Sequence, residues 1–232
     1  MWEPQLRSFT SEHRVIAPDL PGFGQTPLES DEVDYRAFVR SALDAAGMDH
    51  AVLIGTSLGA RIAVELALES PERVSALVLV GPGLDGHNWS DAVEAFGEKE
   101  EEALERGDLD GAVEANLRLW LAGPRRSLDA IAPATRGLVA DMQRRSFELQ
   151  RDRELRMVPL EPRASERLAE VQAPTLVLTG DEDVEDIHEI ARKLAAEIPG
   201  AERAAMADAA HLPNLEHPDE FDRIVLGFLE QI

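Results

Sequence analysis

Short apolar runs alternate with stretches of helical periodicity near both ends of this chain, and few folds can accommodate that order. The apolar runs Ala51–Ile54 and Val74–Val80 flank Leu58–Leu68, in which the apolar residues are spaced as in a helix. A further run, Pro174–Leu178, precedes a helical stretch from Val184 to Ile198. Strands separated by helices tend to pair in parallel and to be covered by helices on both faces. The sequence therefore predicts an α/β protein with a mostly parallel sheet.

Further elements are expected on either side of these. Apolar residues predict a strand at Arg14–Pro18 and a weaker one near Arg203–Met206. Helical spacing predicts helices at Tyr35–Ala46, which Gly47 is placed to end, and at Asp219–Leu229.

The middle of the chain has a different pattern. From about residue 87 to 165 the strand signal disappears, and amphipathic helices replace it; Val113, Leu117 and Trp120 fall at i, i+4 and i+7. We therefore expect a core made of residues 1–86 and 166–232, interrupted by a helical insertion at 87–165.

A Gly-x-Ser-x-Gly motif, Gly55-Thr56-Ser57-Leu58-Gly59, lies between a predicted strand and a predicted helix. A nucleophilic serine occupies a sharp turn of this kind, where small flanking residues let the strand and the helix approach each other. The backbone N–H of Leu58, at the start of the helix, would then point toward a developing oxyanion. Ser57 is the predicted nucleophile.

A serine nucleophile needs a histidine base and a carboxylate that orients the histidine. Asp183 follows the strand Pro174–Leu178, and His211 precedes the last helix, so both are expected at the carboxyl ends of strands. Asp181 and Asp208 are alternatives for the acid, and His217 is the nearest alternative for the base.

Composition narrows the classes of function. The chain has no cysteine, which excludes disulfides, thiolate metal sites and a cysteine nucleophile. Its net charge of −22 argues against nucleic-acid and anionic-membrane partners. No apolar run approaches the roughly 18 residues of a membrane span, and the first residues do not resemble a signal peptide, so the cytoplasm is the expected compartment. Neither a metal cluster nor a nucleotide fingerprint is apparent, so we expect catalysis without a cofactor.

Four segments together resemble the α/β-hydrolase family in order and spacing. They are Asp19–Gly24 (DLPGFG), Gly55–Gly59 (GTSLG), Gly180–Asp183 (GDED) and Ala210–Pro218 (AHLPNLEHP). Within that family the chain looks most like 3-oxoadipate enol-lactonases and related small esterases. The resemblance implies the α/β-hydrolase fold, Asp183 as the acid of a catalytic triad, and a helical insertion that serves as a cap over the pocket.

The resemblance also indicates which reaction to expect. A serine at position 57, where related dehalogenases and epoxide hydrolases carry aspartate, favours acyl transfer on a small carboxylic ester or lactone. Carbon–carbon bond hydrolysis and cofactor-free perhydrolysis with the same triad remain alternatives, as does a non-catalytic binding protein. Trp89 and Trp120 are candidates for the substrate pocket, although aromatic packing is the more frequent use of such residues.

The start of the chain departs from the family pattern. Family members begin with a hairpin, a central strand and a His-Gly loop that supplies the second oxyanion donor, whereas Met1–Leu6 resembles the helix that follows that loop. We expect the chain as written to lack these parts, either because its start is assigned late, which we favour, or by true truncation. An unpaired strand edge left in this way would promote self-association.

Overall fold

A parallel sheet forms the centre of the protein. The computed structural model describes residues 1–151, 153 and 155–232, and the main sheet of this part has four strands in the order β2-β3-β5-β6, all parallel. These strands are β2 (Ala51–Thr56), β3 (Val74–Val80), β5 (Thr175–Gly180) and β6 (Glu202–Met206). The predicted α/β class is confirmed.

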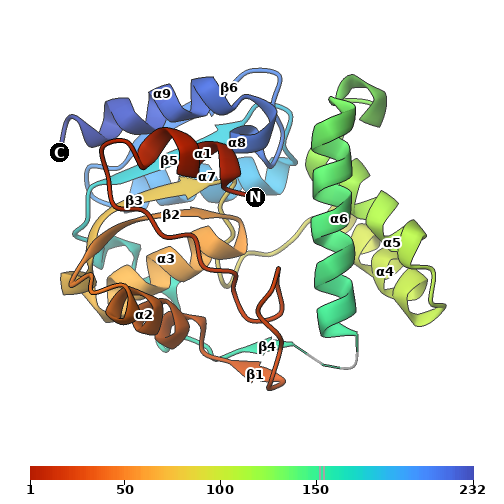
Figure 1. Ribbon diagram of the computed structural model, residues 1–232, viewed down its shortest axis with the longest axis horizontal. Coiled ribbons are helices and arrows are strands. Elements are labelled where there is room, and N and C mark those ends of the chain that lie inside the picture. The colour runs from red at the N-terminus through yellow and green to blue at the C-terminus, as the bar shows by residue number, and fades with distance from the viewer. Residues whose placement is uncertain (152, 154) are drawn as a thin grey trace.

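Side chains of β3 alternate between two apolar clusters, one on each face of the sheet. Leu77 and Leu79 pack with helices α3 and α7, whereas Val78 and Val80 pack with α1 and α9. This follows from the strand geometry, in which successive side chains point to opposite faces. The helices are α3 (Leu58–Glu69), α7 (Glu185–Glu197), α1 (Glu3–Phe9) and α9 (Pro218–Leu229). Figure 1 shows α1 and α9 along one side of the sheet and α3 on the other.

Three helices stand beside this sandwich and form a separate layer, which we call the helical layer (Figure 1). They are α4 (Asp91–Glu105), α5 (Leu109–Asn116) and α6 (Pro133–Gln150). The segment Leu117–Ala122, in π-helical conformation, continues directly from α5. Leu117 and Leu121 pack with Val139 of α6 and with Leu215 from the sandwich, so the layer has a small apolar cluster of its own.

The remaining elements are short or peripheral. A two-residue parallel pair joins β1 (Glu32–Val33) to β4 (Arg156–Met157), and β4 lies in the insertion, where only helices were expected. Helix α2 (Tyr35–Ala45) packs on α3, and α8 (Pro213–Glu216) precedes α9. Turns of 3₁₀ helix lie at Pro71–Arg73, Leu128–Ala130, Ala164–Glu166 and Leu168–Glu170. Within the described residues, none of the helices has the length and apolar character that a membrane span requires.

One predicted strand is wrong. Arg14–Pro18 has no regular secondary structure, and Ile16 within it is 39% exposed. A strand is stabilised by backbone hydrogen bonds to a neighbouring strand, and the described part of the chain pairs no strand with this segment. The Arg14 side chain instead donates to the carbonyl oxygen of Ala46. Apolar residues made the segment look like a strand, but without a partner it remains irregular.

Candidate active site

Ser57 occupies the turn between β2 and α3 in a strained conformation. Its φ of 54° and ψ of −112° lie outside the regions that residues with a side chain favour. The turn is tight enough that a Cβ on Gly55 would lie 2.3 Å from the carbonyl carbon of Gly59, so only glycine fits at position 55. Strain of this kind is found where the surrounding structure holds a functional residue in place. The structure therefore gives Ser57 the sharp turn that the motif predicts.

The residues around this turn leave amide donors at the start of α3. Leu58 is the first residue of that helix, and the first N–H groups of a helix have no partner within it. The Ser57 carbonyl oxygen, in contrast, accepts from the N–H groups of Arg61 and Gly83, at 3.1 Å each. The Leu58 N–H is thus placed at the positive end of the helix dipole, beside the serine.

Asp183 and His211 come together from loops that follow neighbouring strands. Asp183 lies after β5 and His211 after β6, and the His211 Nδ1 is 2.8 Å from the Asp183 Oδ2. Their side chains are 0% and 7% exposed, and the Val184 N–H donates to Oδ1 at 2.9 Å. An ionised carboxylate only accepts hydrogen bonds, so this contact assigns the donating N–H to Nδ1, and that tautomer leaves Nε2 as an acceptor.

A glycine between Ser57 and His211 brings the two residues to the same end of the sheet. Thr56 pairs with Val80 in the β2–β3 register, and the Ser57 N–H donates to the Val80 carbonyl oxygen at 3.0 Å. Gly81 follows, and a Cβ there would lie 2.9 Å from His211 Nδ1. The absence of a side chain at position 81 therefore lets the histidine ring approach the end of β3.

The hydroxyl of Ser57 has no hydrogen-bond partner among the residues that the structure describes. A bond between Ser57 and His211 is thus not formed in this structure. Catalytic hydrogen bonds are often long in the absence of substrate and tighten only when substrate binds.

The residues considered as alternatives for the acid and the base, Asp181, Asp208 and His217, make other contacts. His217 lies at the N-terminus of α9, and its Nε2 is 3.3 Å from the backbone carbonyl oxygen of Asp208. Asp208 has a positive φ of 57°, and its carbonyl oxygen also accepts from Arg126. The Asp181 N–H donates to the Met206 carbonyl oxygen at 2.9 Å. The carboxylate that contacts His211 is that of Asp183.

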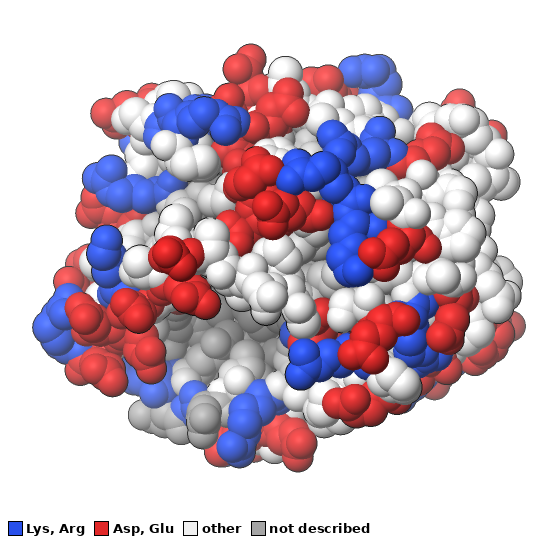
Figure 2. Space-filling model, turned by 180° about the vertical axis from the view of Figure 1, so that it is seen from behind, with Lys and Arg blue, Asp and Glu red and all other residues white. Residues whose placement is uncertain are grey.

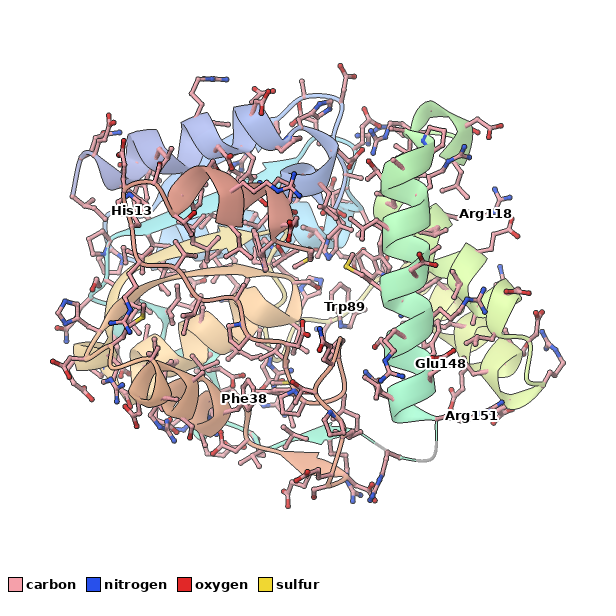
Figure 3. All side chains as sticks on the ribbon, in the orientation of Figure 1. His13, Phe38, Trp89, Arg118, Glu148 and Arg151 are labelled. Carbon is pink, nitrogen blue, oxygen red and sulfur yellow. The ribbon has the colours of Figure 1, made fainter. Side chains whose placement is uncertain are left out.

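The two candidate pocket tryptophans differ in their surroundings. The ring of Trp120 packs against the His211 ring with centroids 4.6 Å apart, and the Trp120 carbonyl oxygen accepts from the His211 N–H at 3.2 Å. Trp89 is 36% exposed and packs edge-on against His87 with centroids 5.0 Å apart. Figure 3 labels Trp89 in the connection that leads from the sheet to the helical layer. The structure thus brings Trp120, but not Trp89, into contact with His211.

Two charged residues next to His211 were missed by the sequence reasoning. Glu216 accepts from the Ala210 N–H at 2.7 Å and pairs with Arg126 at 2.8 Å. Burial raises the pKa of the Glu216 carboxyl, although its bonds to Ala210 and Arg126 work in the opposite direction. Its position five residues after His211 was visible in the sequence, but Arg126 is distant in the chain and carried no signal.

The many acidic residues of the chain could bind a metal ion or form a charged patch. Across the described residues, no three His, Cys, Asp or Glu side chains are grouped so that they could hold a metal ion. On the face shown in Figure 2, acidic and basic side chains are interspersed. The excess of acidic residues in the sequence therefore does not form one patch on that face.

The chain is similar to known hydrolases over most of its length. The sequence profile of the alpha/beta hydrolase family matches residues 1–224. The 2-hydroxy-6-oxo-6-phenylhexa-2,4-dienoate hydrolase of Burkholderia cepacia is 32% identical over 224 residues, which cover 94% of this chain and 77% of that relative. The structure of the enol-lactonase from Burkholderia xenovorans matches with a TM-score of 0.79 and 20% identity, covering 99% of this chain and 85% of that one. A hydrolase from Pseudomonas aeruginosa matches with a TM-score of 0.75 and 26% identity, covering 99% and 84%.

Proposed function

Because the chain belongs to the alpha/beta hydrolase family, we propose that it is a serine hydrolase that cleaves a small carboxylic ester or lactone through an acyl-enzyme. The observation that carries this proposal is the buried Asp183–His211 pair, with its 2.8 Å contact, at the sheet end where the strained turn holds Ser57. A non-catalytic binding protein has no chemical need for these three groups in this arrangement.

Each residue has a distinct role in the proposed reaction. The Ser57 Oγ attacks the carbonyl carbon while His211 Nε2 accepts its proton, and the Leu58 N–H donates to the oxyanion that forms. Collapse of this intermediate breaks the bond to the leaving oxygen, which takes the proton from His211 and leaves an ester on Ser57. His211 then removes a proton from water, whose oxygen attacks the ester, and the acid product leaves as Ser57 recovers its proton.

Asp183 supports the base without touching the substrate. Its carboxylate fixes the proton on Nδ1 and stabilises the imidazolium that forms when Nε2 accepts the serine proton. Because the Asp183 side chain is fully buried, its attraction to the imidazolium is weakly screened.

We further propose that the insertion at 87–165 is a cap and that Trp120 lines the acyl pocket. The ring of Trp120 contacts both His211 and, edge-on with centroids 6.1 Å apart, Phe96 of α4. An aromatic wall beside the base suits the apolar part of a small ester or lactone.

A second candidate function is hydrolysis of a carbon–carbon bond. The name of the Burkholderia cepacia relative describes a substrate with hydroxyl, ketone and carboxylate groups but no ester, so its hydrolysis must break a carbon–carbon bond. At 32% identity that relative favours this chemistry as the alternative for the present chain.

The first experiment is labelling of the purified chain with a fluorophosphonate probe, beside Ser57→Ala, with mass spectrometry of the modified peptide. We expect attachment at Ser57 and none in the variant. A folded chain that stays unlabelled would count against the whole proposal.

The second experiment separates the two reactions. Short esters and lactones are offered beside a 2-hydroxy-6-oxo-dienoate, which contains no ester bond. Turnover of the first group with kcat/KM at least 10-fold higher supports the ester reaction, whereas preference for the dienoate supports carbon–carbon cleavage. Ser57→Ala should abolish either activity, with a loss on the order of 10⁶-fold in kcat if it resembles other serine triads.

A further inference from the structure

A short segment of the helical layer contacts both loops that carry the Asp183–His211 pair. We call Trp120–Arg126 the bridging segment. The Arg125 side chain donates to the Glu182 carboxylate at 3.0 Å and also bonds the carbonyl oxygen of Asp181. On the other loop, Arg126 bonds the carbonyl oxygen of Asp208. A Cβ on Gly123 would lie 1.9 Å from the Glu182 carbonyl oxygen, which shows how closely the segment approaches the first loop.

The bridging segment holds the backbone N–H groups of both Ala210 and His211. The His211 N–H donates to the carbonyl oxygen of Trp120 at 3.2 Å. The preceding amide, that of Ala210, donates to Glu216 Oε1 at 2.7 Å, while the other carboxylate oxygen of Glu216 lies 2.8 Å from Arg126 Nη2. One amide is thus held by the segment directly, and the next is held through the Arg126–Glu216 ion pair.

The ion pair is itself fixed in one geometry. The Glu216 side chain is 4% exposed and that of Arg126 is 15% exposed. Arg126 Nε donates to the Ala122 carbonyl oxygen at 2.9 Å, and Nη2 donates to that of Leu121 at 2.9 Å. A guanidinium held by several acceptors cannot swing away from its carboxylate without losing those bonds, which makes it a rigid support.

From these contacts we propose that Arg126 and Glu216 are positioning residues that hold the backbone at His211, so that the imidazole faces both Asp183 and Ser57. This inference rests on the proposed function, because it assigns His211 the role of base. Neither residue is required to touch the substrate. The Arg126–Glu216 ion pair also makes the position of the base depend on the helical layer, because Arg126 belongs to that layer and Glu216 to the sandwich.

The test compares variants at Glu216 and Arg126, together with one control variant, with the parent chain. Glu216→Ala removes both bonds, whereas Glu216→Gln keeps an oxygen that can accept from the Ala210 N–H but loses the charge that pairs with Arg126. Arg126→Gln removes the other partner. Glu114→Gln is the matched control, because the Glu114–Arg118 ion pair also involves the helical layer, but its side chains are 58% and 65% exposed. Figure 3 shows Arg118 on the outer side of the layer, pointing away from the sandwich.

Two measurements are made on each protein. The first is the rate of fluorophosphonate labelling at Ser57, with kcat and KM for a short ester. The second is the far-downfield proton NMR signal of the His211 Nδ1–H, identified by its loss in His211→Ala. Circular dichroism verifies folding, and if Glu216→Ala does not fold, Glu216→Gln and Arg126→Gln provide the test.

We expect Glu216→Ala to slow labelling and lower kcat by about 100-fold, the effect of a small displacement of a catalytic group, with KM unchanged. Glu216→Gln should recover part of the loss, and adding Arg126→Gln to Glu216→Ala should slow the reaction no further, because the two residues act as one unit. The His211 signal should broaden or disappear in Glu216→Ala and persist in Glu114→Gln.

Unchanged labelling together with an unchanged His211 signal in folded variants would overturn the inference. So would an equal loss in Glu114→Gln. If the parent chain is folded but unlabelled, the proposed function fails, and the NMR signal alone then decides whether the pair positions His211.

Discussion

The sheet sandwich and the helical layer differ in how firmly their residues are buried. Six of the seven residues of β3 are buried, whereas α4 buries only Ala103 among its fifteen. The sandwich supplies the turn of Ser57 and the loops of Asp183 and His211, while the layer contributes Trp120 and Arg126 at a few contacts. The difference predicts that substitutions in the sandwich cost more stability than substitutions in the layer, and that the layer acts on His211 only through these few contacts.

The largest effect expected from this contrast concerns stability. Leu79→Ala, at a fully buried position of β3, should lower the free energy of unfolding by about 3–5 kcal/mol, because it removes packed methyl groups and leaves a cavity. Leu138→Ala on α6, where the side chain is 42% exposed, should change it by less than about 0.5 kcal/mol. Urea titration of both variants measures this, and equal losses would show that the layer is packed as firmly as the sandwich.

A smaller change in the free energy of unfolding is expected where the chain passes from the sandwich into the layer. The Asp186 carboxylate accepts from the Ser90 N–H at 2.6 Å and from its hydroxyl at 2.7 Å. Asp186→Asn should lower the free energy of unfolding at pH 7 by about 1.5–3 kcal/mol, the range for hydrogen bonds to a charged group. The measurement is again urea titration of the variant beside the parent chain.

The same variant has a defined pH dependence. Burial disfavours the ionised form of Asp186, but the bonds from Ser90 and His87 outweigh it and hold the pKa of this carboxyl below its ordinary value of 3.8. A lowered pKa in the folded state means that the stabilisation is present above that value and is lost as the pH falls through the folded pKa. The difference between parent and Asp186→Asn should therefore shrink below about pH 4.

Glu100 on α4 should show the opposite pH dependence of stability. Burial raises the pKa of its carboxyl above the ordinary 4.5, although a hydrogen bond from Asn116 works against this. Its contribution to stability is therefore complete below pH 4.5 and falls as the pH rises through the raised pKa. Glu100→Gln should gain stability relative to the parent as the pH rises, and a gain on acidification instead would contradict this assignment.

The smallest effect concerns the contact between Trp120 of the layer and His211. Trp120→Ala should lower kcat/KM for a short ester by about 2- to 10-fold, because an aromatic pair contributes about 0.5–1.5 kcal/mol. Trp89→Ala is the control, since Trp89 packs against His87 rather than His211. Steady-state kinetics on folded variants measure both, and an equal loss from the two substitutions would remove the distinction between the tryptophans.

Local sequence patterns were sufficient for most elements of the sandwich. The predicted strand Val74–Val80 and the helix beginning at Leu58 are confirmed at those residues. Residue 57 could be placed on a tight turn because glycines flank it within the same five residues. Arg14–Pro18 failed for the opposite reason: its pattern is that of a strand, but strand formation depends on a neighbour that the pattern does not contain.

Only part of the candidate site could be predicted from local sequence patterns. Asp183 and His211 could be proposed from their places after strands, but their 2.8 Å contact joins residues 28 positions apart and follows from the pairing of β5 with β6. Trp120 could be assigned to an amphipathic segment without any indication that it would meet His211.

The sequence by itself determined the α/β class, the strand and helix segments of the sandwich and the sharp turn at Ser57, because each depends on periodicity or backbone geometry within a few residues. Only the tertiary structure decided which carboxylate meets His211, that Trp120 packs on its ring, and that Arg126 and Glu216 pair beside it. These contacts join the helical layer and the loops of the sandwich across long stretches of chain. They depend on how folded elements pack together, which no local pattern specifies.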